Sequence, residues 1–125
     1  MNETVREWRD KAAKDLESAF RELDRGNAGN FDLICFLCQQ GVEKLIKGAI
    51  IAREESPPKT HDLVLLHRML VKLESRWTWE EPELNWLSAS AVTFRYPGDS
   101  VDLATATRAA EIARKVSEAL LQLFT

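Results

Sequence analysis

The sequence predicts an all-α protein, an up-and-down helical bundle of four long helices plus one short helix. Apolar residues recur every three or four positions in five separate segments, which is the period of one face of an α-helix. Segment 31–51 is apolar on nearly all sides, so we expect the other helices to surround it. With 5 glycines and 4 prolines in 125 residues, the chain has few of the turn residues that an all-β fold requires. This length fits a single domain, residues 1–125.

The first predicted helix covers residues 4–25 and is amphipathic. We expect Asn2 or Thr4 to cap its start, because both side chains accept hydrogen bonds from free helix amides. Segment 26–30, rich in glycine and asparagine, ends the helix. So short a connection makes the next helix an antiparallel neighbour. The predicted buried positions are Val5, Trp8, Ala12, Leu16, Ala19 and Leu23.

The second predicted helix begins at residue 31, runs to about residue 53 and lies at the centre of the bundle. It stops before Pro57 and Pro58, because paired prolines do not continue a helix. One strip of this helix is polar, and its spacing places the polar residues on one side. The strip consists of Gln40, Glu43, Lys44 and Lys47. Polar groups on a central helix must be solvated, paired or used in binding.

The third predicted helix is short and is capped by Thr60. His67 lies away from its apolar stripe and is predicted to be a surface residue. Residues 75–81 are predicted to form a loop. The buried side of the helix is predicted to contain Leu63, Leu66, Met69, Leu70 and Leu73.

The fourth predicted helix starts at Pro82, a residue that suits the first helical turn. Its stripe reaches Phe94, and the turn-forming segment 95–100 ends it. Ser100 or Asp102 is expected to cap the last helix. The core-facing residues of that last helix are predicted to be Thr105, Ala109, Ile112, Val116, Leu120 and Leu123.

Composition narrows the possible functions. The net charge of −3 gives no overall basic field for nucleic acid, although a local basic groove remains compatible with it. Cys35 and Cys38 form a C-x-x-C string without a second pair to complete a zinc site, so we predict two reduced thiols buried in the core. No apolar segment is long enough to cross a membrane and no signal peptide opens the chain, which predicts a cytoplasmic protein.

The polar strip has two interpretations. Glu43 and Lys47 have the spacing of an ordinary ion pair on a helix. Because the helix is central, the strip is also suited to line a groove, where Lys44 or Lys47 meets a phosphate and Gln40 hydrogen-bonds a base or sugar.

Two other segments contain candidate binding residues. His61 and Asp62 stand at a helix start, where free amides attract anions; alternatively, Asp62 only stabilises the helix and His61 is a turn residue. Arg95 is suited to clamp a phosphate and Tyr96 to stack on a base; alternatively, the pair only ends a helix. As catalytic groups, His61 and Arg95 are the candidates. The sequence contains no glycine-rich phosphate loop and no metal-ligand spacing, so no cofactor and no metal are predicted.

In this order and spacing, the motifs resemble the HEPN domain family (higher eukaryotes and prokaryotes nucleotide-binding). The resemblance covers nearly the whole chain. Its motifs are Trp8, Ala12, Asp15-Leu16, Asp32, Cys35-Phe36, the segment from Gln39 to Lys47, His61-Asp62-Leu63 and Arg95-Tyr96-Pro97. The resemblance implies a bundle of four to five helices, commonly a homodimer. It also implies a small nucleotidyltransferase as partner, in a two-gene module of toxin–antitoxin type.

Many proteins of this family look like metal-independent RNases. Their motif is an arginine followed, after four to six residues, by a histidine. This sequence departs from the motif: no histidine follows Arg95, and seven residues separate Arg53 from His61. The resemblance therefore implies a nucleotide- or RNA-binding pocket without the usual catalytic pair. The residues carried over are Gln40, Glu43, Lys44, Lys47, His61, Asp62, Arg95, Tyr96 and Pro97.

Three hypotheses follow. The first is a module that binds a nucleotide or RNA. The second is an RNase with a non-standard pair, His61 and Arg95. The third is a purely structural dimerisation or interaction domain, in which Glu43 is saturated by Lys47 or Arg95. In that third hypothesis the interface anchors would be Trp77, Trp79 and Trp86.

Overall fold

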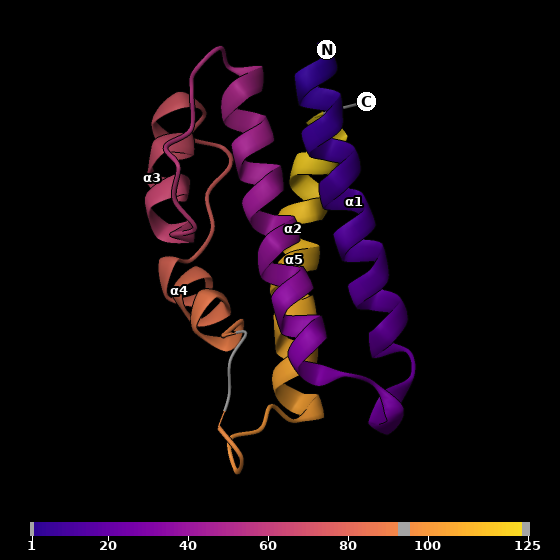
Figure 1. The fold of residues 1–125 in the computed structure, drawn as a ribbon. Helices are drawn as coiled ribbons and strands as arrows, with labels where there is room; N and C mark the ends of the chain where they lie inside the picture. Colours follow the sequence, from indigo (N-terminus) through magenta and orange to yellow (C-terminus); the bar gives the residue numbers. More distant parts are fainter. Residues whose placement is uncertain (1, 93–95, 124–125) are drawn as a thin grey trace.

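The computed structural model describes residues 2–92 and 96–123, and this part of the chain contains helices and loops but no strand. The α-helices are α1 (Glu3–Leu23), α2 (Phe31–Ala52), α3 (Leu63–Leu73), α4 (Glu81–Ser90) and α5 (Leu103–Leu123), with a 3₁₀ turn η1 at Gly26–Ala28 (Figure 1). The all-α prediction is confirmed. Three of these helices are long and two are short, whereas the sequence predicts four long helices. The difference is at α4, which ends at Ser90; the predicted stripe residue Phe94 lies outside the described residues.

Polar side chains cap four of the five helices. Asn2 and Asn30 accept the amides of Val5 and Leu33, and Asp102 accepts the amide of Thr105. At α3 the predicted cap Thr60 is wrong. Asp62 takes this position and accepts the amides of Val64 and Leu65, while the Thr60 hydroxyl accepts the Asp62 amide.

Helix α2 is the centre of the bundle, as its sequence predicts. It contacts each of the other four α-helices, and most of its side chains from Ile34 to Ile50 are buried. Cys35 and Cys38 are reduced and buried, which confirms their prediction as core thiols. Gly41 lets α1 approach closely, since a Cβ added there would lie 2.5 Å from Leu16 Cγ.

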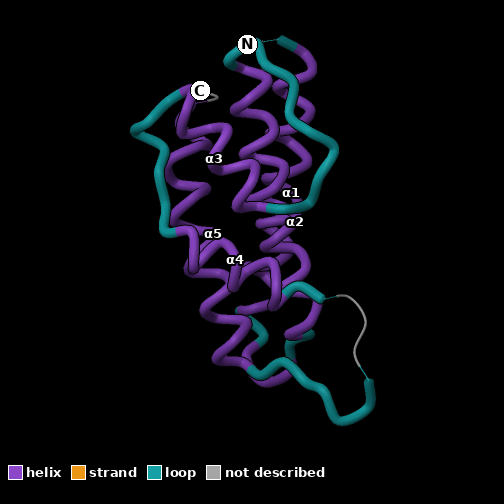
Figure 2. Tube along the Cα trace, turned by 90° about the vertical axis from the view of Figure 1, so that its left-hand side faces the viewer, coloured by secondary structure: helices purple, strands orange, loops and turns teal. Residues whose placement is uncertain are grey.

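The helices run in an order that differs from a simple up-and-down path. Helix α3 starts beside the middle of α2, where His61 contacts Glu43, and ends beside its C-terminus, where Arg53 pairs with Glu74. Helix α3 therefore runs parallel to α2, because residues 53–62 return along the bundle before it begins (Figures 1 and 2). Helices α3 and α4 follow one another along one side of α2, and both ends of the chain lie at the same end of the bundle.

The surface prediction for His67 is wrong, and Trp77 lacks the exposure of an interface anchor. His67 is only 3% exposed, because the α3–α4 loop folds over it and the Trp79 amide donates to its Nε2 at 3.0 Å. Trp77 is buried as well, with the guanidinium groups of Arg53 and Arg76 each 5.1 Å from its ring centre. Trp79 and Trp86 are partly buried against the core. The described helices include none that is both long enough and apolar enough to span a membrane.

Candidate functional site

The candidate site is built around the buried carboxylate of Glu43 in the middle of α2. Its Oε2 accepts a hydrogen bond from Lys47 Nζ at 3.0 Å, and its Oε1 accepts one from Gln39 Nε2 at 3.0 Å. His61 Nδ1 lies 3.0 Å from both carboxylate oxygens. Because a buried charge is stable only when it is paired and hydrogen-bonded, this set of partners explains how Glu43 remains inside the bundle.

The protonation state of Glu43 depends on two opposing effects, burial and hydrogen bonding. Burial by itself would raise the pKa of the carboxyl, but the hydrogen bonds from Lys47, Gln39 and His61 together outweigh burial. The net result is a pKa below the ordinary value of 4.5, so Glu43 is ionised at neutral pH. The side chains of Glu43 and Lys47 are only 6% and 10% exposed, which makes this a buried ion pair.

His61 is the exposed member of the group. Its side chain is 82% exposed, whereas the Glu43 side chain that holds it is buried. The Gln39 amide also donates to the His61 carbonyl oxygen at 3.4 Å, so both the ring and the backbone of His61 are attached to α2. With Nδ1 on the carboxylate, the other ring nitrogen, Nε2, has no hydrogen bond recorded among the described residues.

The cation of the site is held from two sides. Lys47 Nζ donates to Glu43 and lies 5.9 Å from the centre of the Trp8 ring on α1. Both contacts fix the ammonium inside the bundle. Lys47 is therefore a buried counter-charge rather than a lysine that projects freely into a groove.

The partners of the predicted polar strip come from α1, from the loop before α3 and from α2 itself. Lys44 forms an ion pair with Asp15 of α1, while Glu43 and Lys47 join the group at His61. Gln40 donates to the Gln39 side-chain oxygen at 3.1 Å, so it reaches Glu43 only through Gln39. Sequence reasoning missed Gln39, although its position four residues before Glu43 was a signal that the two side chains would meet.

The remaining predicted residues lie apart from this group or outside the described chain. The carboxylate of Asp62 occupies the free amides at the start of α3, so the anion site expected there is taken by the protein's own side chain. Arg95 lies outside the described residues. Tyr96 is 69% exposed in the loop before α5, which lies at an end of the bundle, whereas Glu43 lies mid-helix (Figure 1).

The geometry suits proton transfer or hydrogen bonding to a ligand better than metal binding. The described residues contain no group of three or more histidine, cysteine, aspartate or glutamate side chains placed to hold a metal ion. A histidine oriented through Nδ1 by a carboxylate presents its Nε2 to whatever reaches the surface.

The fold and this group define a helical-bundle protein with a buried acidic residue linked to an exposed histidine. The sequence model of the HEPN domain matches residues 5–123, and the chain therefore belongs to the HEPN domain family. No curated protein matches the sequence.

Two solved structures have a similar fold. TT1696 from Thermus thermophilus is 22% identical, with a TM-score of 0.70 over 94% of this chain and 96% of that one. ST0689, described as an archaeal HEPN homologue, is 19% identical, with a TM-score of 0.65 over 97% and 98% of the two chains. At this level of identity the similarity concerns the fold alone.

Proposed function

We propose that this HEPN-family chain binds a nucleotide or RNA at the surface presented by His61. The observation that carries the proposal is the link between an exposed imidazole and a buried, charge-compensated carboxylate. A histidine that only fills a turn needs no such support. The arrangement fixes the ring while leaving it open to solvent, which lowers the entropy lost when a ligand binds.

The proposed biological setting is a two-gene module of toxin–antitoxin type in the cytoplasm. There the chain would act as a homodimer and as the partner of a small nucleotidyltransferase. This part of the proposal follows from membership of the HEPN family rather than from a contact in the structure. Co-purification of the two gene products from one operon, and the mass of the purified protein in solution, test the partner and the dimer.

Binding at His61 can be tested by NMR titration of the protein with AMP and with a short single-stranded RNA at millimolar concentration. We expect the His61 ring signals to move and His61→Ala to weaken binding about ten-fold, a loss of roughly 1.4 kcal/mol. Because the side chain is 82% exposed and Glu43 keeps its hydrogen bonds to Lys47 and Gln39, we expect the bundle to stay folded.

Lys59→Ala is the matched control. Lys59 is an exposed residue in the same loop and is not part of the Glu43 group. An equal loss in both variants would mean that only local charge matters. If neither ligand binds, the Glu43 group serves the fold alone, which is the structural hypothesis.

A second candidate function, RNA cleavage without a metal ion, is favoured by one observation. Nδ1 of His61 faces a carboxylate, which is the orientation in which Nε2 takes a proton from, or gives one to, a reacting hydroxyl. Cleavage of single-stranded RNA in the presence of EDTA, lost in His61→Ala and reduced in Glu43→Gln, would support this function. Binding without cleavage would restrict the chain to the first proposal.

A further inference from the structure

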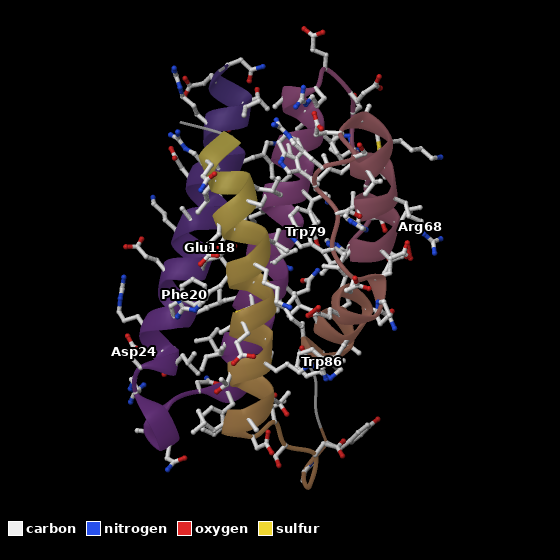
Figure 3. All side chains as sticks on the ribbon, turned by 180° about the vertical axis from the view of Figure 1, so that it is seen from behind. Phe20, Asp24, Arg68, Trp79, Trp86 and Glu118 are labelled. Atoms are coloured by element: carbon white, nitrogen blue, oxygen red, sulfur yellow. The ribbon has the colours of Figure 1, made fainter. Side chains whose placement is uncertain are left out.

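A hollow of about 590 Å³ lies between α3, the α3–α4 loop and the start of α4. Its volume is within the range of small-molecule sites. Val71, Trp79 and Pro82 contribute apolar lining, and Lys72 and Glu80 contribute charge. Figure 3 labels Trp79 and Arg68, two of the residues around it. The Glu43 group does not contribute to its lining.

The wall of the hollow is fixed by polar contacts. The Trp79 amide donates to His67 Nε2 at 3.0 Å and holds the loop on α3. Arg68 then joins α3 to α4, donating from Nε and Nη2 to the Glu81 carboxylate at 3.0 and 2.9 Å. A wall formed before a ligand arrives requires little ordering upon binding.

His67 supports the wall of the hollow. It lines the hollow, is 3% exposed, and its Nδ1 is buried without a hydrogen-bond partner. Because Nε2 accepts the Trp79 amide, the ring proton is on Nδ1. Burial lowers the pKa of His67 below its ordinary value of 6.5, which keeps the ring neutral. The neutral His67 ring, whose centroid lies 5.7 Å from that of the Trp79 ring, therefore supports the Trp79 side of the hollow.

The charges around the hollow define what the ligand must carry. The Arg68 guanidinium is engaged by Glu81, whereas no ion pair is recorded for the Lys72 ammonium among the described residues. Lys72 therefore offers a cation to an anionic group. The Glu80 side chain makes no recorded cap hydrogen bond and offers an acceptor to ring N–H groups. The Trp79 ring is partly buried and offers an aromatic surface for stacking.

We propose that this hollow is a second binding site, which stacks a planar heteroaromatic ring on Trp79 and pairs the ring's anionic substituent with Lys72. Free nucleotides and small aromatic carboxylates share this chemistry. The proposal goes beyond the function proposed at His61, because none of the residues that line the hollow belongs to the Glu43 group. The two sites can therefore be tested separately.

The test is a calorimetric titration with AMP and with indole-3-acetate, using uncharged adenosine as the matched ligand. We expect Trp79→Ala to weaken binding roughly ten-fold or more, in the range of a lost aromatic stack, and Trp79→Phe to restore most of it. Lys72→Gln should weaken the two anionic ligands and leave adenosine unchanged. Lys14→Gln, an exposed lysine of α1, should have no effect.

The outcomes separate the two sites and the two ligand sources. Binding of AMP alone identifies a nucleotide site, and binding of indole-3-acetate alone identifies an aromatic-carboxylate site. If AMP binding is lost in His61→Ala and unchanged in Trp79→Ala and Lys72→Gln, the hollow is not a nucleotide site. If, in addition, indole-3-acetate does not bind, the proposal is wrong while the proposed function at His61 stands. Loss in the Trp79 and Lys72 variants alone, with His61→Ala unaffected, establishes the hollow.

Discussion

At the scale of single residues, the two cysteines show how burial controls reactivity. Cys38 lies on α2 inside the core, with Cys35 one helical turn away. Burial, and to a smaller extent the neighbouring Cys35, raise the pKa of the Cys38 thiol to about 12, although the charge of Arg114 acts in the opposite direction. The thiolate is the reactive form, so the Cys38 thiol is unreactive in the folded protein.

This predicts that Cys38 resists alkylation in the folded state. With a pKa of about 12, only about one thiol in ten thousand is ionised at pH 8. We expect iodoacetamide at pH 8 to leave the native protein unmodified by mass spectrometry, under conditions that consume free glutathione. The same treatment in guanidinium chloride should modify both cysteines. Rapid labelling without denaturant would contradict the burial of the thiols.

Residue burial could be predicted from the sequence only where it depends on helix periodicity. Cys35, Cys38 and Leu16 lie on predicted stripes and are buried. His67 and Trp77 lie off the stripes and are nevertheless buried, because the α3–α4 loop returns over α3 and the end of the bundle. A contact made by a loop far along the chain leaves no periodic signal.

At the scale of helices, the contact between α1 and α2 depends on the missing side chain of Gly41. Leu16 of α1 is 2% exposed and occupies the space where a Gly41 Cβ would lie. The ion pair between Lys44 and Asp15 joins the same two helices nearby. This explains why glycine, a poor helix former, is present in the middle of the central helix.

Gly41→Ala is therefore expected to destabilise the protein, although alanine favours helix formation. Overpacking a core typically costs about 1–3 kcal/mol, which exceeds the gain of about 1 kcal/mol in helix propensity. Urea denaturation should show a lower midpoint. In a Leu16→Ala background the clash is absent, so the same substitution should become neutral or stabilising. Equal destabilisation in both backgrounds would show that Leu16 is not the obstacle.

The starts of α1 and α5 could be predicted from the sequence, whereas the direction of α3 could not. Asn2 and Asp102 cap α1 and α5 as expected, because a cap depends on neighbours within one turn. The parallel direction of α3 depends instead on the path of residues 53–62, which the sequence reveals only as a proline-containing connection. Lys44 and Glu43 have separate partners for a related reason: Asp15 of α1 pairs with Lys44, and His61 of this connection contacts Glu43.

At the scale of the whole molecule, two buried groups link stability to pH. The folded pKa of His67 is lowered by burial, so between that pKa and 6.5 the unfolded chain binds more protons than the folded chain. Stability is therefore lost as pH falls below 6.5. The folded pKa of Glu43 is lowered as well, and its contribution is present above 4.5 and is lost as pH falls through the folded pKa.

We predict that the free energy of unfolding decreases on acidification in two stages, the first below pH 6.5 and the second below pH 4.5. Urea denaturation at a series of pH values measures both. His67→Gln keeps an acceptor for the Trp79 amide and removes the titrating ring, so it should abolish the first stage and retain the second. A first stage that persists in this variant must come from another group.

The overall class of the molecule could be predicted because five apolar stripes and one almost wholly apolar helix allow few arrangements other than a bundle. The arrangement of the candidate site could be predicted only in part. Glu43 contacts both Lys47 and His61, and the sequence identifies all three as candidate residues. Gln39 was overlooked, and Asp62 is used as a cap. Which polar residues meet depends on how the helices rotate against each other, and periodicity leaves that rotation open.

Both ends of the described chain lie at one end of the bundle, with the loop before α5 at the other (Figures 1 and 2). A label or fused protein therefore leaves the bundle from the same end whether it is attached to α1 or to α5. Moving the fused protein from one terminus to the other changes the order of the two parts in the sequence, but it leaves the fused protein at the same end of the bundle. The opposite end, which carries Tyr96, stays uncovered in either case.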